Sequence, residues 1–301
     1  MNPAIATENL TRRYGRTTAV DGLTLSVPEG SIYAFLGPNG AGKTTTIKML
    51  LNILRPTGGA AQILGVESAR LGPSQFSQIG YVSENQRMPE WMTVRQLIEF
   101  CRPMYPTWNI ALSDKLLRSF DLPPDRKLKS LSRGMKMKAA LLTSLAYRPR
   151  LLVLDEPFTG LDALVRDEVI GGMLEVTEQE KWTVFISSHD IDDVERLADW
   201  VGVLDGGRVY LSESASSLQG RFRRLEAVAD DGARLPARPP KSWLTPELTP
   251  HRVSVVETRY EEGASERQLA QVLPGAEQIT ASEMTLREIF LALARTFRIK
   301  P

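Results

Sequence analysis

The stretch Gly37-Pro38-Asn39-Gly40-Ala41-Gly42-Lys43-Thr44, followed by Thr45, decides the fold class, because it has the order G-x-x-x-x-G-K-[ST]. An unbroken apolar run at residues 32–36 precedes it, as expected for a strand covered on both faces. Apolar residues at helical spacing follow it, at Ile47, Leu50, Leu51 and Leu54. A strand, a glycine-rich turn and a helix in this order predict an α/β fold with a phosphate-binding loop.

The residue types in this loop suit phosphate chemistry. Glycines let backbone N–H groups curl around phosphate oxygens without a Cβ clash, and the following helix N-terminus adds partial positive charge. We expect Lys43 to reach the β- and γ-phosphates of a nucleoside triphosphate and the Thr44 hydroxyl to ligate Mg²⁺. The alternative, a glycine-rich turn that binds nothing, is disfavoured by the correct flanks. The loop alone does not separate kinases, GTPases and motor ATPases.

Two further apolar runs end in polar side chains. Residues 151–154 lead into Asp155 and Glu156, and residues 184–186 lead toward His189. Because strand carboxyl ends face the ligand crevice of a parallel sheet, we expect Asp155 to hold Mg²⁺, and Glu156 to act as the general base on water. His189 would donate to the γ-phosphate or position that water. The alternatives are a solvated acidic turn and an ordinary surface histidine.

Residues 131–135, Leu-Ser-Arg-Gly-Met, begin a helix for which Ser132 is a good N-cap. That cap alone explains the serine. The alternative is an exposed helix N-terminus that offers Ser132 Oγ and the Gly134 N–H to a phosphate. Since such a site does not easily reach a nucleotide held by its own subunit's loop, it would act across a dimer.

Composition limits the remaining classes. The chain has 301 residues, 42% hydrophobic and 24% charged, with a formal net charge of +1, proportions typical of a folded, soluble protein. Its single cysteine, Cys101, excludes an intrachain disulfide, and the near-zero net charge argues against a nucleic-acid partner. No stretch approaches the ~20 apolar residues that span a bilayer, and residues 1–10 do not resemble a signal peptide. Any membrane role is expected to be peripheral.

The sequence patterns of residues 1–212 and of residues 213–301 differ. Residues 1–212 alternate short strands with helical patterns and include a hairpin signal at residues 205–207, whereas residues 213–301 begin irregularly with several prolines. In the second region, Val253 and Val255 indicate a strand, and Ser265 and Thr285 look like two helix starts. We expect a small C-terminal α/β appendage.

Taken in order, residues 37–45, 131–135, 151–156, 159–162 and 188–189 closely resemble the ATP-binding cassette of ABC transporters, over about residues 3–212. The resemblance implies a P-loop NTPase cassette with a mixed, mostly parallel core sheet, an antiparallel β subdomain and a helical subdomain at about residues 85–147. Residues 213–301 would be an accessory domain.

The resemblance also implies a mechanism. Tyr14 matches the aromatic residue that stacks on adenine, Val20 the apolar residue beside it, and Asp162 the loop that couples two sites. Two cassettes, identical or related, pack head to tail on ATP and Mg²⁺, so that each nucleotide lies between one phosphate loop and the partner's Ser132 and Gly134. Hydrolysis reopens the pair and drives a separate transmembrane permease at the cytoplasmic face of the membrane. Export is the direction of transport that we expect.

Two departures from the family pattern stand out. Glu84 occupies the position where the family usually has glutamine, so it is expected near the nucleotide as a Mg²⁺ ligand but adds negative charge beside the γ-phosphate. Arg133 replaces a glycine and Met135 a glutamine in the signature. Because Ser132 and Gly134 remain, we expect hydrolysis to be retained.

Large apolar residues crowd the segment after Glu84, where the family meets its permease. Trp91 and Tyr105 are expected to be exposed contacts, although the core of the helical subdomain would explain such residues too. Two other functions stay open. One is an ABC-type ATPase acting on ribosomes or nucleic acid; the other is a regulatory module that binds ATP without turnover.

Overall fold

The computed structural model describes residues 3–84, 86–180, 182–230 and 233–298, without the side chains of 175–180 and 297–298. The chain divides into two compact units, residues 1–212 and 213–301. The first unit has two sheets and the second unit has one, and each unit has its own core, so each is described by itself.

A six-stranded sheet forms the centre of the first unit, in the order β10-β9-β3-β8-β7-β6. Its neighbours β9 and β3, β3 and β8, β8 and β7, and β7 and β6 are parallel. The strands are β3 (Ile32–Leu36), β6 (Ile79–Ser83), β7 (Leu151–Asp155), β8 (Thr183–Ser188), β9 (Trp200–Asp205) and β10 (Arg208–Ser214). The carboxyl ends of β3, β6, β7 and β8 therefore lie along one edge, as the apolar runs predict.

A second, antiparallel sheet has the order β2-β1-β4-β5. Its strands are β1 (Pro3–Tyr14), β2 (Thr17–Pro28), β4 (Gly58–Ile63) and β5 (Val66–Glu67). In β2, Leu23, Leu25 and Val27 are buried and alternate with exposed residues, as the sequence predicts. Their side chains join those of Phe35 and Phe185 in one core cluster, so the two sheets of this unit share a core.

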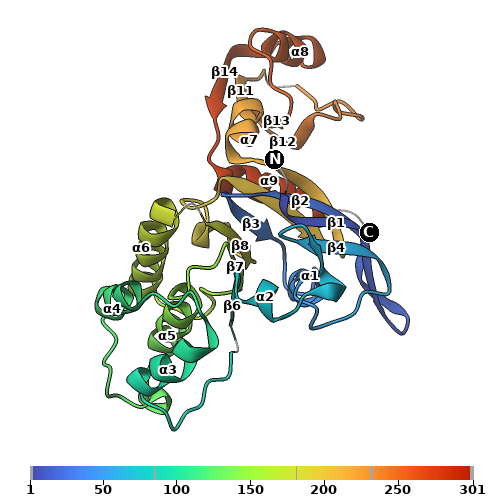
Figure 1. Ribbon diagram of the computed structural model, residues 1–301. Coiled ribbons are helices and arrows are strands. Elements are labelled where there is room, and N and C mark those ends of the chain that lie inside the picture. Colours follow the sequence, from blue (N-terminus) through green and yellow to red (C-terminus); the bar gives the residue numbers. More distant parts are fainter. Residues whose placement is uncertain (1–2, 85, 181, 231–232, 299–301) are drawn as a thin grey trace. The chain divides into compact units, whose positions relative to one another are not determined.

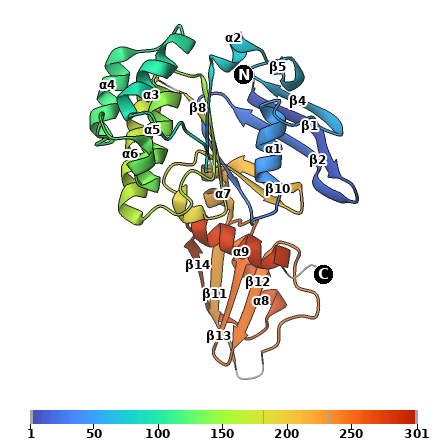
Figure 2. The same cartoon turned by 90° about the horizontal axis from the view of Figure 1, so that it is seen from below.

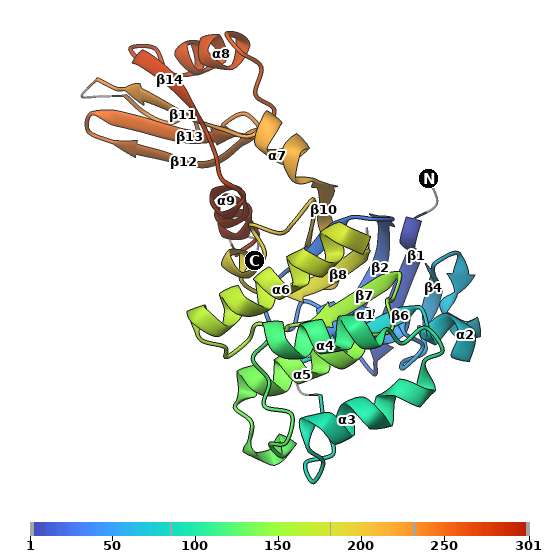
Figure 3. The same ribbon diagram turned by 60° about the vertical axis from the view of Figure 1, so that its left-hand side comes forward.

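Two helices of the first unit begin at the N-caps that the sequence predicts. Thr93 accepts from the Gln96 N–H at the start of α3, and Ser132 accepts from the Met135 N–H at the start of α5. Figures 1 and 3 show α3, α4 and α5 gathered together, in agreement with the predicted helical subdomain. The helices are α1 (Lys43–Leu50), α2 (Pro73–Phe76), α3 (Val94–Cys101), α4 (Ile110–Ser119), α5 (Arg133–Leu145) and α6 (Ala163–Glu180), with single 3-10 turns at Ser68–Arg70, Arg102–Met104, Leu128–Ser130 and Ile191–Asp193.

The second unit is a small α/β fold. Figure 2 shows its strands side by side with helices packed against them, in the sheet order β12-β13-β11-β14. Its elements are α7 (Ala215–Arg221), β11 (Arg223–Val228), β12 (Trp243–Thr249), β13 (Arg252–Glu257), α8 (Ala264–Val272), β14 (Glu277–Glu283) and α9 (Leu286–Arg298). Leu225, Val253, Val255 and Leu269 form its core.

The two helix starts expected in the second unit fare differently. Thr285 and Glu288 form a reciprocal capping box before α9, as predicted. The prediction for Ser265 is wrong, because α8 is capped by Gly263 at φ +72°. Ser265 lies within the first turn of α8, and its hydroxyl accepts from the N–H of Glu261, which precedes the helix, at 3.0 Å.

Within the described residues, no helix combines the length and the apolar character needed to cross a bilayer.

Candidate nucleotide-binding site

The loop from Gly37 to Gly42 joins the end of β3 to α1, whose first turn holds Lys43, Thr44 and Thr45, and it has little room for side chains. A Cβ at Gly37 would lie 2.2 Å from the Leu204 carbonyl oxygen, and one at Gly42 would lie 2.5 Å from that of Ala19. Gly42 has φ +107° and is the N-cap of α1. Because glycine has no side chain to cap the helix, the first turn of α1 is suited to hold an anion with its N–H groups.

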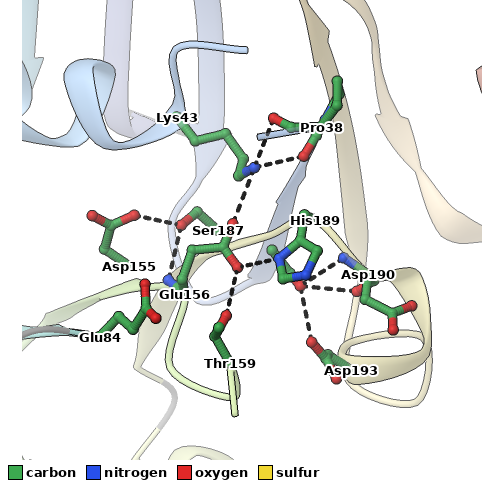
Figure 4. A network of polar contacts seen from close by, with 12 residues as sticks. Pro38, Lys43, Glu84, Asp155, Glu156, Thr159, Ser187, His189, Asp190 and Asp193 are labelled. Carbon is green, nitrogen blue, oxygen red and sulfur yellow. Dashed lines mark hydrogen bonds and ion pairs between the residues drawn. The ribbon is translucent and has the colours of Figure 1, made fainter. Parts of the chain in front are cut away.

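Lys43 is held under this loop and is only 5% exposed. Its Nζ donates to the carbonyl oxygens of Gly37 at 2.5 Å and Pro38 at 3.1 Å, and lies 3.0 Å from Glu156 Oε1 (Figure 4). Lys43 therefore links the phosphate loop after β3 to the acidic end of β7, a contact that the sequence does not predict, and its contact with phosphates stays a prediction.

Asp155 ends β7 next to the hydroxyl that the sequence predicts for the metal. Its Oδ1 accepts from Thr44 Oγ1 at 3.0 Å and from Ser187 Oγ at 2.8 Å. Burial raises the pKa of this carboxyl, although the two hydroxyls act in the opposite direction. A hydroxyl and a carboxylate are hard oxygen donors, and Mg²⁺ usually takes few protein ligands, so the pair fits that ion.

Glu156 stands at the centre of the polar network in Figure 4. Its backbone has φ +53°, a left-handed conformation that residues other than glycine rarely adopt. Its N–H donates to Ser187 Oγ at 3.1 Å. Its Oε2 lies 2.8 Å from His189 Nδ1 and accepts from Thr159 Oγ1 at 3.1 Å. Burial alone would raise the pKa of Glu156, but the hydrogen bond from His189 and the ammonium of Lys43 outweigh it and lower the pKa. The carboxylate is thus kept ionised, the state that a general base needs.

A second layer supports His189, and the sequence does not reveal it. Ser188 Oγ, next to His189, donates to Asp193 Oδ2 at 3.1 Å, and Asp193 Oδ1 lies 2.8 Å from Arg166 Nη1. Arg166 belongs to α6, directly after the loop that carries Asp162. The first turn of α6 is therefore tied to the segment that holds His189.

The residues expected at the adenine lie in different surroundings. The ring of Tyr14 is exposed, with the Arg12 guanidinium 4.6 Å from its centre. Val20 is fully buried in the core, with its Cγ2 against Gly42. Val20 thus packs against the phosphate loop at Gly42. Its contact with a base stays a prediction.

The signature residues lie at the start of α5. Ser132 is exposed, and its hydroxyl caps the helix. Gly134 is buried, and a Cβ there would lie 2.4 Å from Val165 Cγ1 in α6. Glu84, which follows β6, forms an ion pair with Arg133, and its Oε1 lies 2.7 Å from Arg133 Nη2. The two departures from the family pattern are thus partners.

A phosphate loop, a Thr–Asp pair and a carboxylate bound to both a lysine and a histidine define a P-loop ATPase. Residues 20–159 match the ABC transporter family model. The bacitracin transport ATP-binding protein BcrA of Enterococcus faecalis is 32% identical over 77% of this chain and 76% of its own. The daunorubicin/doxorubicin resistance ATP-binding protein DrrA of Streptomyces peucetius is 36% identical over 74% and 70%. The daunorubicin resistance ATP-binding protein DrrA3 of Streptomyces coeruleorubidus is 31% identical over 96% and 95%.

Solved structures agree. An ATP-binding subunit of an ABC transporter, 27% identical, has a TM-score of 0.65 over 72% of this chain and 92% of its own. A second, cbiO1 from Clostridium perfringens, is 28% identical with a TM-score of 0.61, over 71% and 89%. This chain belongs to the family of ABC transporter ATP-binding proteins, and it is an ATP-binding, ATP-hydrolysing subunit of that family.

Proposed function

We propose that this chain powers an exporter: two cassettes, identical or related, close on two magnesium-bound ATP molecules and drive a separate transmembrane permease at the cytoplasmic face of the membrane. The observation that carries the catalytic part is the convergence of Lys43 and His189 on Glu156. Export is supported by the relatives, whose names refer to bacitracin transport and daunorubicin resistance.

In this proposal the ion pair between Lys43 and Glu156 is the resting arrangement. Incoming β- and γ-phosphates compete for the Lys43 ammonium, which they attract more strongly than one carboxylate does. Glu156 then keeps His189 and Thr159 as partners, and its Oε1 is released to accept a proton from the attacking water. Thr44 and Asp155 would hold Mg²⁺, which when bound neutralises charge on the phosphate oxygens.

The second cassette completes the site. Ser132 is exposed at the N-terminus of α5, so its hydroxyl and the nearby Gly134 N–H are proposed to meet the phosphate held by the other cassette. Tyr14 is proposed to stack on the adenine from its own side. Nucleotide binding and pairing of the cassettes are therefore one event in this scheme.

A groove in the first unit suits the permease. It has a volume of about 430 Å³ and runs between the core and the helices, past Phe76, Tyr81, Cys101 and Tyr147. Tyr105 is half-buried, because its ring stacks on that of Tyr147 with the ring centroids 3.8 Å apart, but it lines the groove and its contact with a permease stays a prediction. Trp91 is exposed as predicted. Among the exposed large apolar side chains, Ile53 and Phe76 line this groove, and Phe100 and Met104 belong to α3 and to the 3-10 turn after it. A short apolar helix of the permease is the proposed occupant.

The test is Glu156→Gln, which keeps the shape but removes the base. Turnover, measured as phosphate release, should fall by about 10²- to 10⁴-fold, while ATP affinity is retained. Light scattering should show this variant pairing when magnesium and ATP are added. Glu8→Gln, which changes an exposed carboxylate of β1, is the matched control.

Unchanged turnover in Glu156→Gln would remove the base. A variant that stays monomeric with ATP, alone and with a related cassette, would remove the two-cassette scheme. Co-purification with a multi-span membrane protein supports the permease, whereas stimulation of the ATPase by ribosomes or DNA favours the alternative.

A further inference from the structure

The half-buried ion pair between Glu84 and Arg133 joins two segments that are far apart in the chain. The residues are 49 positions apart, and their side chains are 31% and 49% exposed. Glu84 follows β6 of the core sheet, and Arg133 is the first residue of α5. The fold therefore brings an unusual acid and an unusual base of this sequence into contact.

The guanidinium also lies on the loop after β7. Gly160 has φ +71°, and a Cβ there would lie 2.6 Å from Arg133 Nη1 and 2.9 Å from its Cζ. The flat guanidinium thus rests directly on this backbone. The preceding residue, Thr159, donates to Glu156 at 3.1 Å. Arg133 therefore contacts the two segments that flank the catalytic carboxylate.

The position of Glu84 explains why its charge matters. Its N–H donates to the Asp155 carbonyl at 2.9 Å, so that Glu84, Asp155 and Glu156 gather at adjoining strand ends (Figure 4). A triphosphate must bind at this edge, and carboxylates there oppose its charge. Lys43 lies against Glu156, and Arg133 lies against Glu84.

We propose that Arg133 is a positioning residue that holds and neutralises the Glu84 carboxylate, so that the pair acts as one unit that preserves selectivity for ATP over ADP. The γ-phosphate carries the charge by which the two nucleotides differ, and it is the group nearest to catalysis. Loss of the guanidinium alone leaves an uncompensated carboxylate, whereas loss of both charges leaves none. This inference rests on the proposed function, because it takes the Lys43 loop as the triphosphate site.

The test measures the affinity for β,γ-imido ATP and for ADP by calorimetry. Arg133→Gln should weaken binding of the ATP analogue about fivefold and of ADP by less than about twofold, because the unpaired carboxylate repels the additional charge. Arg133→Lys, which keeps the charge, and the double variant Glu84→Gln/Arg133→Gln should both stay within about twofold of the wild type. The loss should shrink at high salt, since the pair is half exposed.

Two comparisons isolate the pair. Arg95→Gln removes a guanidinium from an exposed pair with Asp125, 3.2 Å away in the helical subdomain, and should change neither affinity. Repeating the series with EDTA should preserve the pattern, because Arg133 acts through Glu84 and not through a metal. Under these conditions Glu84→Gln alone should bind the ATP analogue at least as tightly as the wild type.

Equal losses for ATP and ADP in Arg133→Gln, or a double variant that keeps the loss, would overturn the inference. If Arg133→Gln does not fold, Glu84→Gln in EDTA takes its place in the test. A weaker affinity of that variant for the ATP analogue than that of the wild type would also overturn the inference. Lys43→Ala in the same assay separates the two levels. If it loses ATP affinity while the variants at positions 84 and 133 do not, only the pair is refuted; if it too is unchanged, the proposed nucleotide site is refuted.

Discussion

Both units bury charged side chains, but they use them differently. In the first unit, Lys43 is buried at the start of α1 and Asp155 at the end of β7, and they bond to the side chains of Glu156, Thr44 and Ser187 from other elements. In the second unit, Glu257 is 1% exposed and accepts from Ser242 Oγ at 3.0 Å and from the Arg259 N–H at 2.7 Å, so that it joins the chain before β12 to the end of β13. The comparison teaches that a buried charge alone does not mark a site.

Electrostatics sharpen this difference. Two adjacent acids of the first unit have pKa values moved in opposite directions, raised for Asp155 by burial and lowered for Glu156 by His189 and Lys43 against the effect of its burial. Such a split assigns different roles to neighbouring carboxylates. In the second unit, Glu213 is bound by a guanidinium that also donates to the Thr258 carbonyl at 2.6 Å, so that the pair fixes the backbone.

The largest expected effect tests whether the second unit has a core of its own. Leu225→Ala removes a fully buried side chain from that core and should destabilise the unit by about 2–5 kcal/mol. Hydrogen exchange should show faster exchange in β11 and β13, while MgATP affinity stays within about twofold. Leu291→Ala, at an exposed position of α9, is the matched control. Equal destabilisation by both variants would refute the assigned core.

The next effect concerns the first unit. Lys43→Ala removes a cation that is buried against the loop carbonyls and Glu156, so ATP affinity should fall by about thirtyfold, the equivalent of about 2 kcal/mol for a charged hydrogen bond. Binding of adenosine, which has no phosphate, should be unchanged. Lys48→Ala changes an exposed lysine of the same helix and controls for charge. Equal losses for ATP and adenosine would mean that Lys43 only supports the fold.

Local patterns in the sequence predict the parts of this site that depend on one segment. The run before Gly37, the acids after residues 151–154 and the cap at Ser132 each follow from neighbours in the chain, and the structure has these elements in place. Local patterns in the sequence do not predict contacts between distant segments. Pairing of Glu84 with Arg133 depends on how α5 packs beside β6, and no periodicity encodes that.

The same limit explains two other residues. Val20 reads as an apolar residue free to meet a base, but its strand continues the shared core and buries it completely. The sequence does not distinguish Asp193 from the neighbouring acids Asp190 and Asp192, yet Arg166 and Ser188 bind it from two other elements. Residue type and spacing specify the chemistry, whereas tertiary packing decides which side chains reach it.

The smallest expected effect is a pH dependence of the second unit. The hydrogen bond from Arg221 lowers the pKa of Glu213 against the opposing effect of its partial burial. A lowered pKa means that the ionised carboxylate stabilises the fold, so this contribution is present above the unfolded-state value and is lost as the pH falls through the folded-state pKa. Glu213→Gln should therefore cost about 1 kcal/mol or less near pH 7. The difference from the wild type in denaturant unfolding should vanish in acid. Glu247→Gln, whose partner Arg295 is 3.5 Å away with both side chains about two-thirds exposed, should show no such trend. A cost for Glu213→Gln that persists in acid would mean that the residue contributes packing and not charge, and the pair would then no longer distinguish the second unit from the first.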